Sequence, residues 1–178
     1  MGFSKRMTAL AVAGALALGL GGCGGAKMWR GDVEVRPDAA LVNQPGGAPT
    51  IRVDLVAVND VDLNAWQAKA MSEYWEPGDA LRTSAEFKYT MTFAEGRTGA
   101  QTLVKKDQIW NEWKSRGAMH LLVLADLPGS HQDLPGDTDA RRKVLPLDSS
   151  RWEPNQKIRI LLQRAGVRVE TPPKPIGQ

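Results

Sequence analysis

Residues Glu86–Phe93, EFKYTMTF, are the clearest strand pattern in this sequence of 178 residues. Aromatic and apolar residues occupy every second position, and lysine or threonine occupies the positions between them. Successive side chains of a strand point to opposite faces of a sheet, so this alternation predicts one face in a core and the other in solvent. Such half-solvated strands are typical of antiparallel sheets.

Further strand-like segments lie on both sides of this one. Residues 33–36 and 50–58 alternate apolar with charged side chains, whereas Ala118–Pro128, AMHLLVLADLP, is a continuous apolar run. A run of this kind predicts a strand that is covered on both faces. The remaining candidate strands are residues 100–106, 141–147, 157–163 and 166–170.

Two segments have helical spacing instead. Residues 60–75 place apolar and aromatic side chains three or four positions apart, and Asp60 or Asp62 can cap the N-terminus. A shorter helix is expected after Asp107. Strands and helices do not alternate regularly, so the order predicts a mainly β protein: an antiparallel β-sandwich with one or two inserted helices, in one domain at 31–170.

The N-terminal residues have the pattern of an export signal. Lys5 and Arg6 precede an uncharged run that is too short and too rich in glycine to span a bilayer. We therefore expect a signal peptide at 1–22, a short tether at 23–30 and, beyond the domain, a proline-rich tail at 171–178.

The only cysteine follows the expected signal directly. The residues concerned are Leu20, Gly21, Gly22 and Cys23. They resemble the lipobox of bacterial lipoproteins, which implies cleavage between Gly22 and Cys23, acylation of Cys23 and attachment to a lipid bilayer. In bacterial lipoproteins an aspartate directly after the acylated cysteine resembles an inner-membrane retention signal, and here that position is Gly24. By this analogy the anchor lies in the outer membrane, with the domain facing the periplasm. The alternative is cleavage by an ordinary signal peptidase, with Cys23 left as a free thiol.

The composition argues against nucleic-acid binding and excludes an intramolecular disulfide. The formal net charge of +3 falls to about +1 when Lys5 and Arg6 leave with the signal, so no basic footprint for nucleic acid remains. A single cysteine cannot form an intramolecular disulfide, and stability must therefore come from packing of the core.

Few residues could carry chemistry. Ser130, His131 and Asp133 are neighbours in one loop, which does not hold the fixed geometry of an activated nucleophile. Asp133, Asp137 and Asp139 could offer oxygens to calcium, but their spacing differs from that of an EF-hand loop. The sequence contains no paired metal-ligand motif and no phosphate-binding glycine loop, so we expect neither enzymatic activity nor a cofactor.

Between Val33 and Trp75 an early strand, a Pro/Gly turn, a second alternating strand and a helix of small and aromatic residues follow one another. The turn contains Asn43, Pro45, Gly46, Gly47 and Pro49. This order resembles the outer-membrane lipoprotein of the type VI secretion membrane complex, the TssJ family. The late apolar run Ala118–Pro128 is also similar to a strand of that family.

The resemblance implies a transthyretin-like sandwich with a structural role. It implies that the loop between the first two strands contributes to binding the periplasmic domain of a large inner-membrane secretion protein. The corresponding residues here are Asn43, Gln44, Pro45, Gly46, Gly47, Ala48 and Pro49. A simple hairpin turn is an equally good interpretation of this loop.

The competing hypothesis is a periplasmic lipoprotein that binds peptidoglycan, a glycan or a small ligand. Such a module would use exposed aromatic side chains as its stacking surface, and the sequence contains six tryptophans. This hypothesis predicts a saturable change in tryptophan fluorescence when cell-wall fragments are added.

Overall fold

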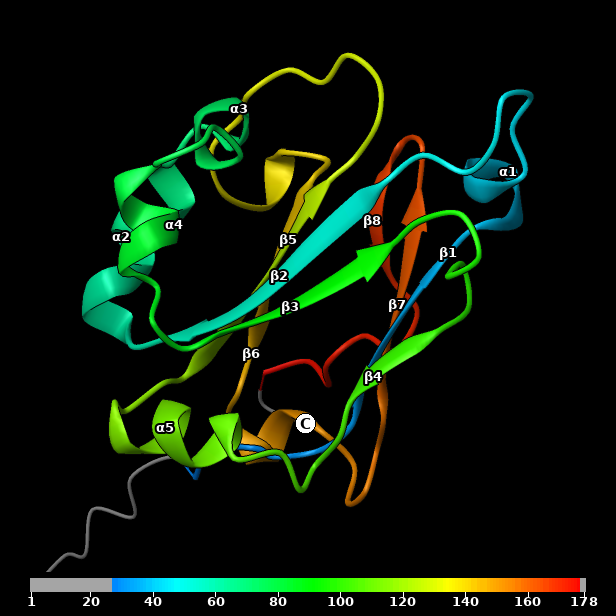
Figure 1. Cartoon of the computed structure of the whole chain (residues 1–178). Helices are drawn as coiled ribbons and strands as arrows, with labels where there is room; N and C mark the ends of the chain where they lie inside the picture. The colour runs from blue at the N-terminus through cyan, green and yellow to red at the C-terminus, as the bar shows by residue number, and fades with distance from the viewer. Residues whose placement is uncertain (1–26, 177–178) are drawn as a thin grey trace, which may run out of the picture.

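The computed structural model describes residues 27–176 (Figure 1). The predicted signal peptide at 1–22, with Gly22, and the acylation site Cys23 lie outside these described residues. One four-stranded sheet has the order β4-β1-β7-β8, and the other has the order β3-β2-β5-β6. The first comprises β1 (Val33–Pro37), β4 (Gln101–Leu103), β7 (Ile158–Gln163) and β8 (Gly166–Val169). The second comprises β2 (Ile51–Val58), β3 (Lys88–Phe93), β5 (His120–Asp126) and β6 (Arg142–Pro146).

The predicted β-sandwich is confirmed, with one difference in strand direction. β1 pairs in parallel with β7, from Val33 opposite Ile158 to Pro37 opposite Leu162, whereas the other strand pairs are antiparallel. Parallel neighbours need a long connection. Here nearly the whole domain separates the two strands, a long-range pairing that local sequence patterns do not indicate.

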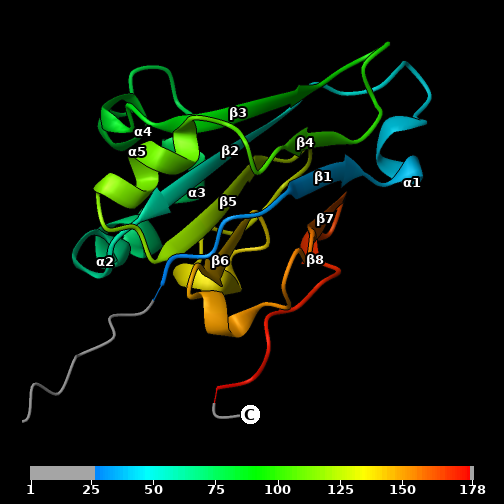
Figure 2. The same cartoon turned by 90° about the horizontal axis from the view of Figure 1, so that it is seen from below.

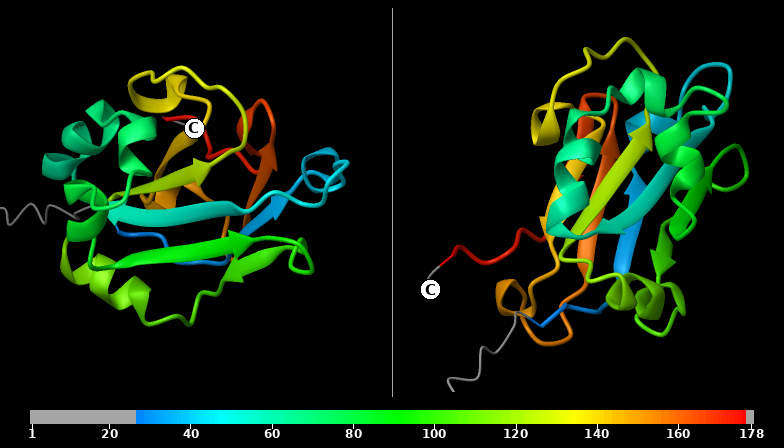
Figure 3. Two further views of the ribbon diagram at one scale, coloured as in Figure 1. Left: turned by 45° about the horizontal axis from the view of Figure 1, so that its top comes forward. Right: turned by 90° about the vertical axis from the view of Figure 1, so that its left-hand side faces the viewer.

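The strand β5 is buried on both faces, as its continuous apolar run predicts. Leu121, Val123 and Ala125 belong to the core between the sheets, and Leu122 and Leu124 belong to a second core on the outer face of their sheet. Figure 3 shows the helices that cover this outer face. The sandwich therefore has two hydrophobic cores that share one sheet.

The helix expected at 60–75 is interrupted. It consists of α2 (Asp60–Ala68) and α3 (Met71–Tyr74), because Lys69 and Ala70 have extended backbones. The N-cap of α2 is Asn59 and neither of the two expected aspartates: its Oδ1 accepts a hydrogen bond from the amide of Asp62 at 2.9 Å. Residues 27–176 contain five α-helices where one or two were expected; the others are α1 (Ala39–Val42), α4 (Ala80–Ser84) and α5 (Ile109–Ser115).

Asp54 of β2 ties the helices to the sheet. Its carboxylate is fully buried on the helix-covered face. It accepts hydrogen bonds from Tyr74 Oη at 2.9 Å, Arg82 Nε at 2.9 Å and Thr90 Oγ1 at 2.6 Å. Burial, followed by the charge of Asp54, raises the pKa of the Tyr74 hydroxyl above its usual value, which keeps this donor protonated.

The segment before β1 packs on the domain, although we expected residues 23–30 to be a tether. Trp29 is only 6% exposed. Its ring lies 5.8 Å from the ring of Trp110 and 5.4 Å from that of Trp152. Met28 forms a bridge with Asp148 beside η2 (Ser149–Arg151). The burial of a large indole explains why this part of the expected tether belongs to the domain.

No helix in residues 27–176 is long and apolar enough to cross a membrane. The expected tail is also tied to the domain, because the amide of Lys174 donates to the carbonyl of Arg151 at 2.8 Å.

Gly31 tests the packing of Trp29. A Cβ atom at this position would overlap the Trp29 indole, which neighbouring aromatic rings hold in place. We expect Gly31→Ala to lower the free energy of unfolding by about 1–3 kcal/mol, as overpacking in a core does. Gly99→Ala is the control because an added Cβ meets nothing within 4 Å there. Chemical denaturation of both variants measures the difference, and equal stabilities would contradict the buried position of Trp29.

Candidate functional site: the loops at the distal end

Four of the connections between strands lie at the same end of the sandwich. They are residues 38–50, 94–100, 127–141 and 164–165. The ends of β1 and β7 lie together because these strands are parallel, and the β-pairing registers bring the other turns to the same end. We call this the distal end. The first described segment of the chain and α5 lie toward the opposite end, which we call the proximal end (Figure 1).

The 38–50 connection is built on the short helix α1. Asp38 caps this helix by accepting from the amide of Ala40 at 2.8 Å, and the amide of Asn43 donates to the carbonyl of Ala39 at 2.9 Å. Leu41 is 1% exposed and anchors the connection in the core. The burial of Leu41 therefore fixes the position at which the 43–49 loop begins.

The predicted contact loop forms a turn supported by its own hydrogen bonds. Gln44 Nε2 donates to the carbonyl of Leu41 at 2.8 Å, and the amide of Gly47 donates to the carbonyl of Gln44 at 3.1 Å. Gly46 has φ 97° and Gly47 has φ 98°, values that favour glycine. The loop residues Asn43, Pro45, Gly46 and Gly47 are exposed, and Gln44, Ala48 and Pro49 are half-buried. All seven predicted residues thus form one accessible projection.

The long distal connection at 127–141 is fixed by ion pairs. Arg141 Nη2 lies 2.8 Å from the fully buried carboxylate of Asp139 and 2.5 Å from Asp133 Oδ1. The carboxylate of Asp133 also accepts from the amide of Ser72 at 2.9 Å and from its hydroxyl at 2.5 Å. These contacts connect the loop to α3.

These contacts also separate the residues that we considered for chemistry. Asp133 bonds to Ser72 and Arg141, so it does not orient His131 toward Ser130. Asp137 has a different contact from Asp133 and Asp139: its Oδ1 accepts from the amide of Val144 at 2.5 Å. Within residues 27–176 no group of three or more potential metal ligands comes together, and the calcium hypothesis gains no support.

Arg142 was missed by sequence reasoning. Its guanidinium is fully buried and donates to four carbonyl oxygens, those of Trp66, Lys69, Leu134 and Gly136, at 2.7–2.9 Å. Burial lowers the pKa of this group. The sequence contained one indication of this buried group: two adjacent arginines, Arg141 and Arg142, at the start of an apolar strand. Arg142 joins the end of α2 to the distal loop that contains η1 (Gly136–Thr138).

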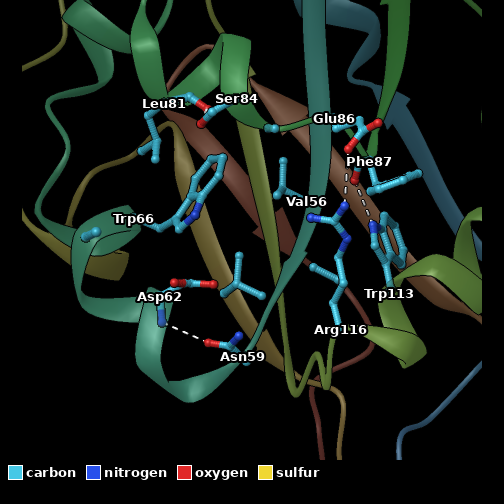
Figure 4. Close-up of a pocket in the computed structure, with 14 residues that line it drawn as sticks. Val56, Asn59, Asp62, Trp66, Leu81, Ser84, Glu86, Phe87, Trp113 and Arg116 are labelled. Carbon is cyan, nitrogen blue, oxygen red and sulfur yellow. Dashed lines mark hydrogen bonds and ion pairs between the residues drawn. The ribbon is translucent and has the colours of Figure 1, made fainter.

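A cavity of about 260 Å³ lies under α2 and α4 (Figure 4). Some of its polar lining makes internal contacts: Arg116 Nη2 lies 3.2 Å from Glu86 Oε2, and the Trp113 indole N–H donates to the carbonyl of Phe87 at 2.8 Å.

The tryptophans do not form a stacking surface. Each of the six is at most 9% exposed, and they are Trp29, Trp66, Trp75, Trp110, Trp113 and Trp152. A module that binds glycans by stacking needs aromatic faces in solvent, whereas these tryptophans are core residues. Their burial does not support the binding-module hypothesis.

The ionisation of Asp133 should control the stability of the distal end. Hydrogen bonds from Ser72, followed by Arg141, lower the pKa of Asp133 to about 2. A lowered pKa contributes stability above the usual carboxylate pKa of about 4, and this stability is lost as the pH falls toward about 2. We expect Asp133→Asn to cost about 1 kcal/mol at pH 7 and to weaken the decline between pH 4 and 2. Denaturation curves across this range test this, with the exposed carboxylate variant Glu76→Gln as the control; parallel curves for the Asp133 variant and wild type would contradict it.

Comparisons with known proteins bear on the fold. No protein-family model and no curated protein sequence matches the chain. A chain of a solved type VI membrane complex is similar at TM-score 0.53 and 14% identity, over 82% of this chain and all of that one. Lip of Serratia marcescens, a membrane-bound component of the type VI secretion system, gives TM-score 0.50 and 16% identity, over 82% and 98%.

A further similar chain comes from the structure of the C-terminal domain of the type VI secretion protein TssM from EAEC. It gives TM-score 0.51 and 13% identity, over 78% of this chain and 98% of that one. At such low identity these likenesses establish the fold: this chain has a sandwich that is also found among components of the type VI secretion membrane complex.

Proposed function

We propose that this protein is a structural lipoprotein of a type VI secretion membrane complex. Acylated Cys23 holds it in the outer membrane, and its domain faces the periplasm and docks the periplasmic domain of a large inner-membrane secretion protein. The observation that carries this proposal is the placement of the first described residues and the 43–49 loop toward opposite ends of the sandwich. The likeness to Lip of Serratia marcescens, a membrane-bound component of the type VI secretion system, supports it.

The anchor follows from the sequence order Leu20-Gly21-Gly22-Cys23. One acyl chain binds a membrane only marginally, since each buried methylene contributes about 0.8 kcal/mol, whereas two or three chains make release negligible. The role needs no catalytic residue: a lipid attachment and a rigid docking surface are sufficient.

The docking surface in this proposal is the exposed turn at 43–49. A turn that is already fixed loses little conformational entropy on binding, which favours its use as a contact. Internal hydrogen bonds and the buried Leu41 supply this rigidity. The proposed partner is a protein of the inner membrane. The occurrence of this fold in a type VI membrane complex supports this choice.

Replacing the acylated residue tests the anchor. We expect Cys23→Ser to move the protein from the outer-membrane fraction to the soluble periplasm and to abolish type VI secretion, because the thiol is the site of lipid attachment. Fractionation and a secretion assay measure both effects. Secretion that continues unchanged with a soluble protein would contradict the anchoring role.

A matched pair of proline substitutions tests the docking loop. Pro45 and Pro154 are both exposed, but Pro45 lies in the distal loop and Pro154 lies at the proximal end. We expect Pro45→Arg to weaken binding to the inner-membrane partner about tenfold, equivalent to about 1.4 kcal/mol, because a bulky charge would enter the contact. Pro154→Arg should leave binding unchanged.

Co-purification from crosslinked envelopes and titration of the purified domains measure this effect. Equal binding by both variants would remove the 43–49 loop from the interface while leaving the anchor proposal intact.

A further inference from the structure

The proximal end contains a second cavity, of about 420 Å³. Figure 2 shows the molecule from below, the side on which α5 and the first described residues lie. Three cations line this cavity: Lys27, Arg30 and Lys105. Among the described residues the single acid in the lining is Glu153, and its carboxylate already pairs with Lys174 at 2.7 Å. The cavity therefore carries an excess of positive charge.

The guanidinium of Arg30 is held in place by uncharged oxygens. Its Nε donates to the carbonyl of Lys105, its Nη1 to Asn111 Oδ1 at 2.9 Å and its Nη2 to the carbonyl of Asp107 at 3.2 Å. A guanidinium has five N–H groups, so one on each Nη remains for another acceptor. Each of these N–H groups can donate to an oxygen of a phosphate.

Lys105 has a similar environment. Its Nζ lies 3.4 Å from Asn155 Oδ1, an uncharged acceptor, and its backbone amide donates to Asp32 Oδ1 at 2.8 Å, which fixes its main chain. The apolar part of the lining consists of Met28, Trp29, Trp152 and Pro154. An anionic ligand with an apolar portion fits these groups.

The position of the cavity along the chain identifies a source for that ligand. Lys27 follows Cys23 by four residues, and an extended chain covers at most about 3.6 Å per residue. The Cα atom of Lys27 therefore lies within about 14 Å of that of Cys23. If Cys23 is acylated, the cavity must lie close to the surface of the bilayer.

We propose that this proximal cavity binds the phosphate of an anionic phospholipid headgroup in the leaflet that holds acylated Cys23. The inference rests on the proposed acylation. Arg30 and Lys105 contact the phosphate, and Lys27 adds charge at the rim. Anionic leaflets attract clusters of lysine and arginine close to their surface. The bound headgroup orients the domain so that its distal loops face away from the membrane.

The test uses the full acylated protein reconstituted into vesicles of phosphatidylcholine, with and without phosphatidylglycerol. The rate of lysine modification by an amine-reactive reagent is read by mass spectrometry at Lys27, Lys105 and Lys143. We expect Lys27 and Lys105 to react about threefold more slowly on vesicles with phosphatidylglycerol, an effect that high salt removes. Lys143, on β6, should react equally on both vesicles.

Two neighbouring lysines provide matched variants. Lys105 lines the cavity, whereas Lys106 is exposed but does not line it. We expect Lys105→Gln to abolish the protection of Lys27 and Lys106→Gln to retain it. Equal loss in both variants would indicate a diffuse charge effect and would overturn the cavity assignment.

The outcomes separate this inference from the proposed function. Failure of the protein to float with neutral vesicles would contradict acylation and, with it, this inference. Flotation with both vesicles but equal labelling rates would overturn only the headgroup site. Equal protection on neutral vesicles after addition of soluble cell-wall fragments would assign the cavity to a glycan and overturn the lipid assignment.

Discussion

The burial of β5 on both faces is the constraint on which the rest of the structure depends. Leu121 and Val123 face the core between the sheets, and Leu122 and Leu124 face the helices. A strand with this sequence is stable only when both faces are covered, because each exposed apolar side chain would forfeit about 1.5–3 kcal/mol of burial. The opposite sheet covers one face, and α2 and α3 cover the other.

The helical cover in turn fixes the distal end. Arg142, next to β5 in the sheet, donates to carbonyls at the end of α2 and in the 127–141 loop. A buried guanidinium must find acceptors, so these segments are held in one arrangement. The parallel pairing of β1 with β7 then sets the direction of the N-terminal strand. As a consequence, the segment next to the proposed lipid anchor lies far from the turn at 43–49.

Local patterns in the sequence predicted where the strands lie better than which strands pair with one another. Alternation located Lys88–Phe93, and the apolar run located β5 with both faces buried, because such patterns report burial directly. The pairing of β1 with β7 and the clamp around Arg142 depend on contacts between distant residues, which no local pattern contains. Asp54 alternates like a solvent-facing residue but is buried, since Tyr74, Arg82 and Thr90 satisfy its carboxylate. Trp29 follows a glycine-rich stretch, and its burial depends on contacts with distant residues, among them Trp110 and Trp152.

The central claim is that the sandwich stands on the membrane with its 43–49 loop pointing away. Cys23 is the only cysteine and is proposed to be acylated, so a cysteine introduced at Asn43 or at Lys106 can be labelled singly. The eight residues of β2 alone span about 26 Å. On vesicles that carry a headgroup quencher, the account predicts strong quenching of a fluorophore at position 106 and little at position 43. Equal quenching at the two positions would contradict it.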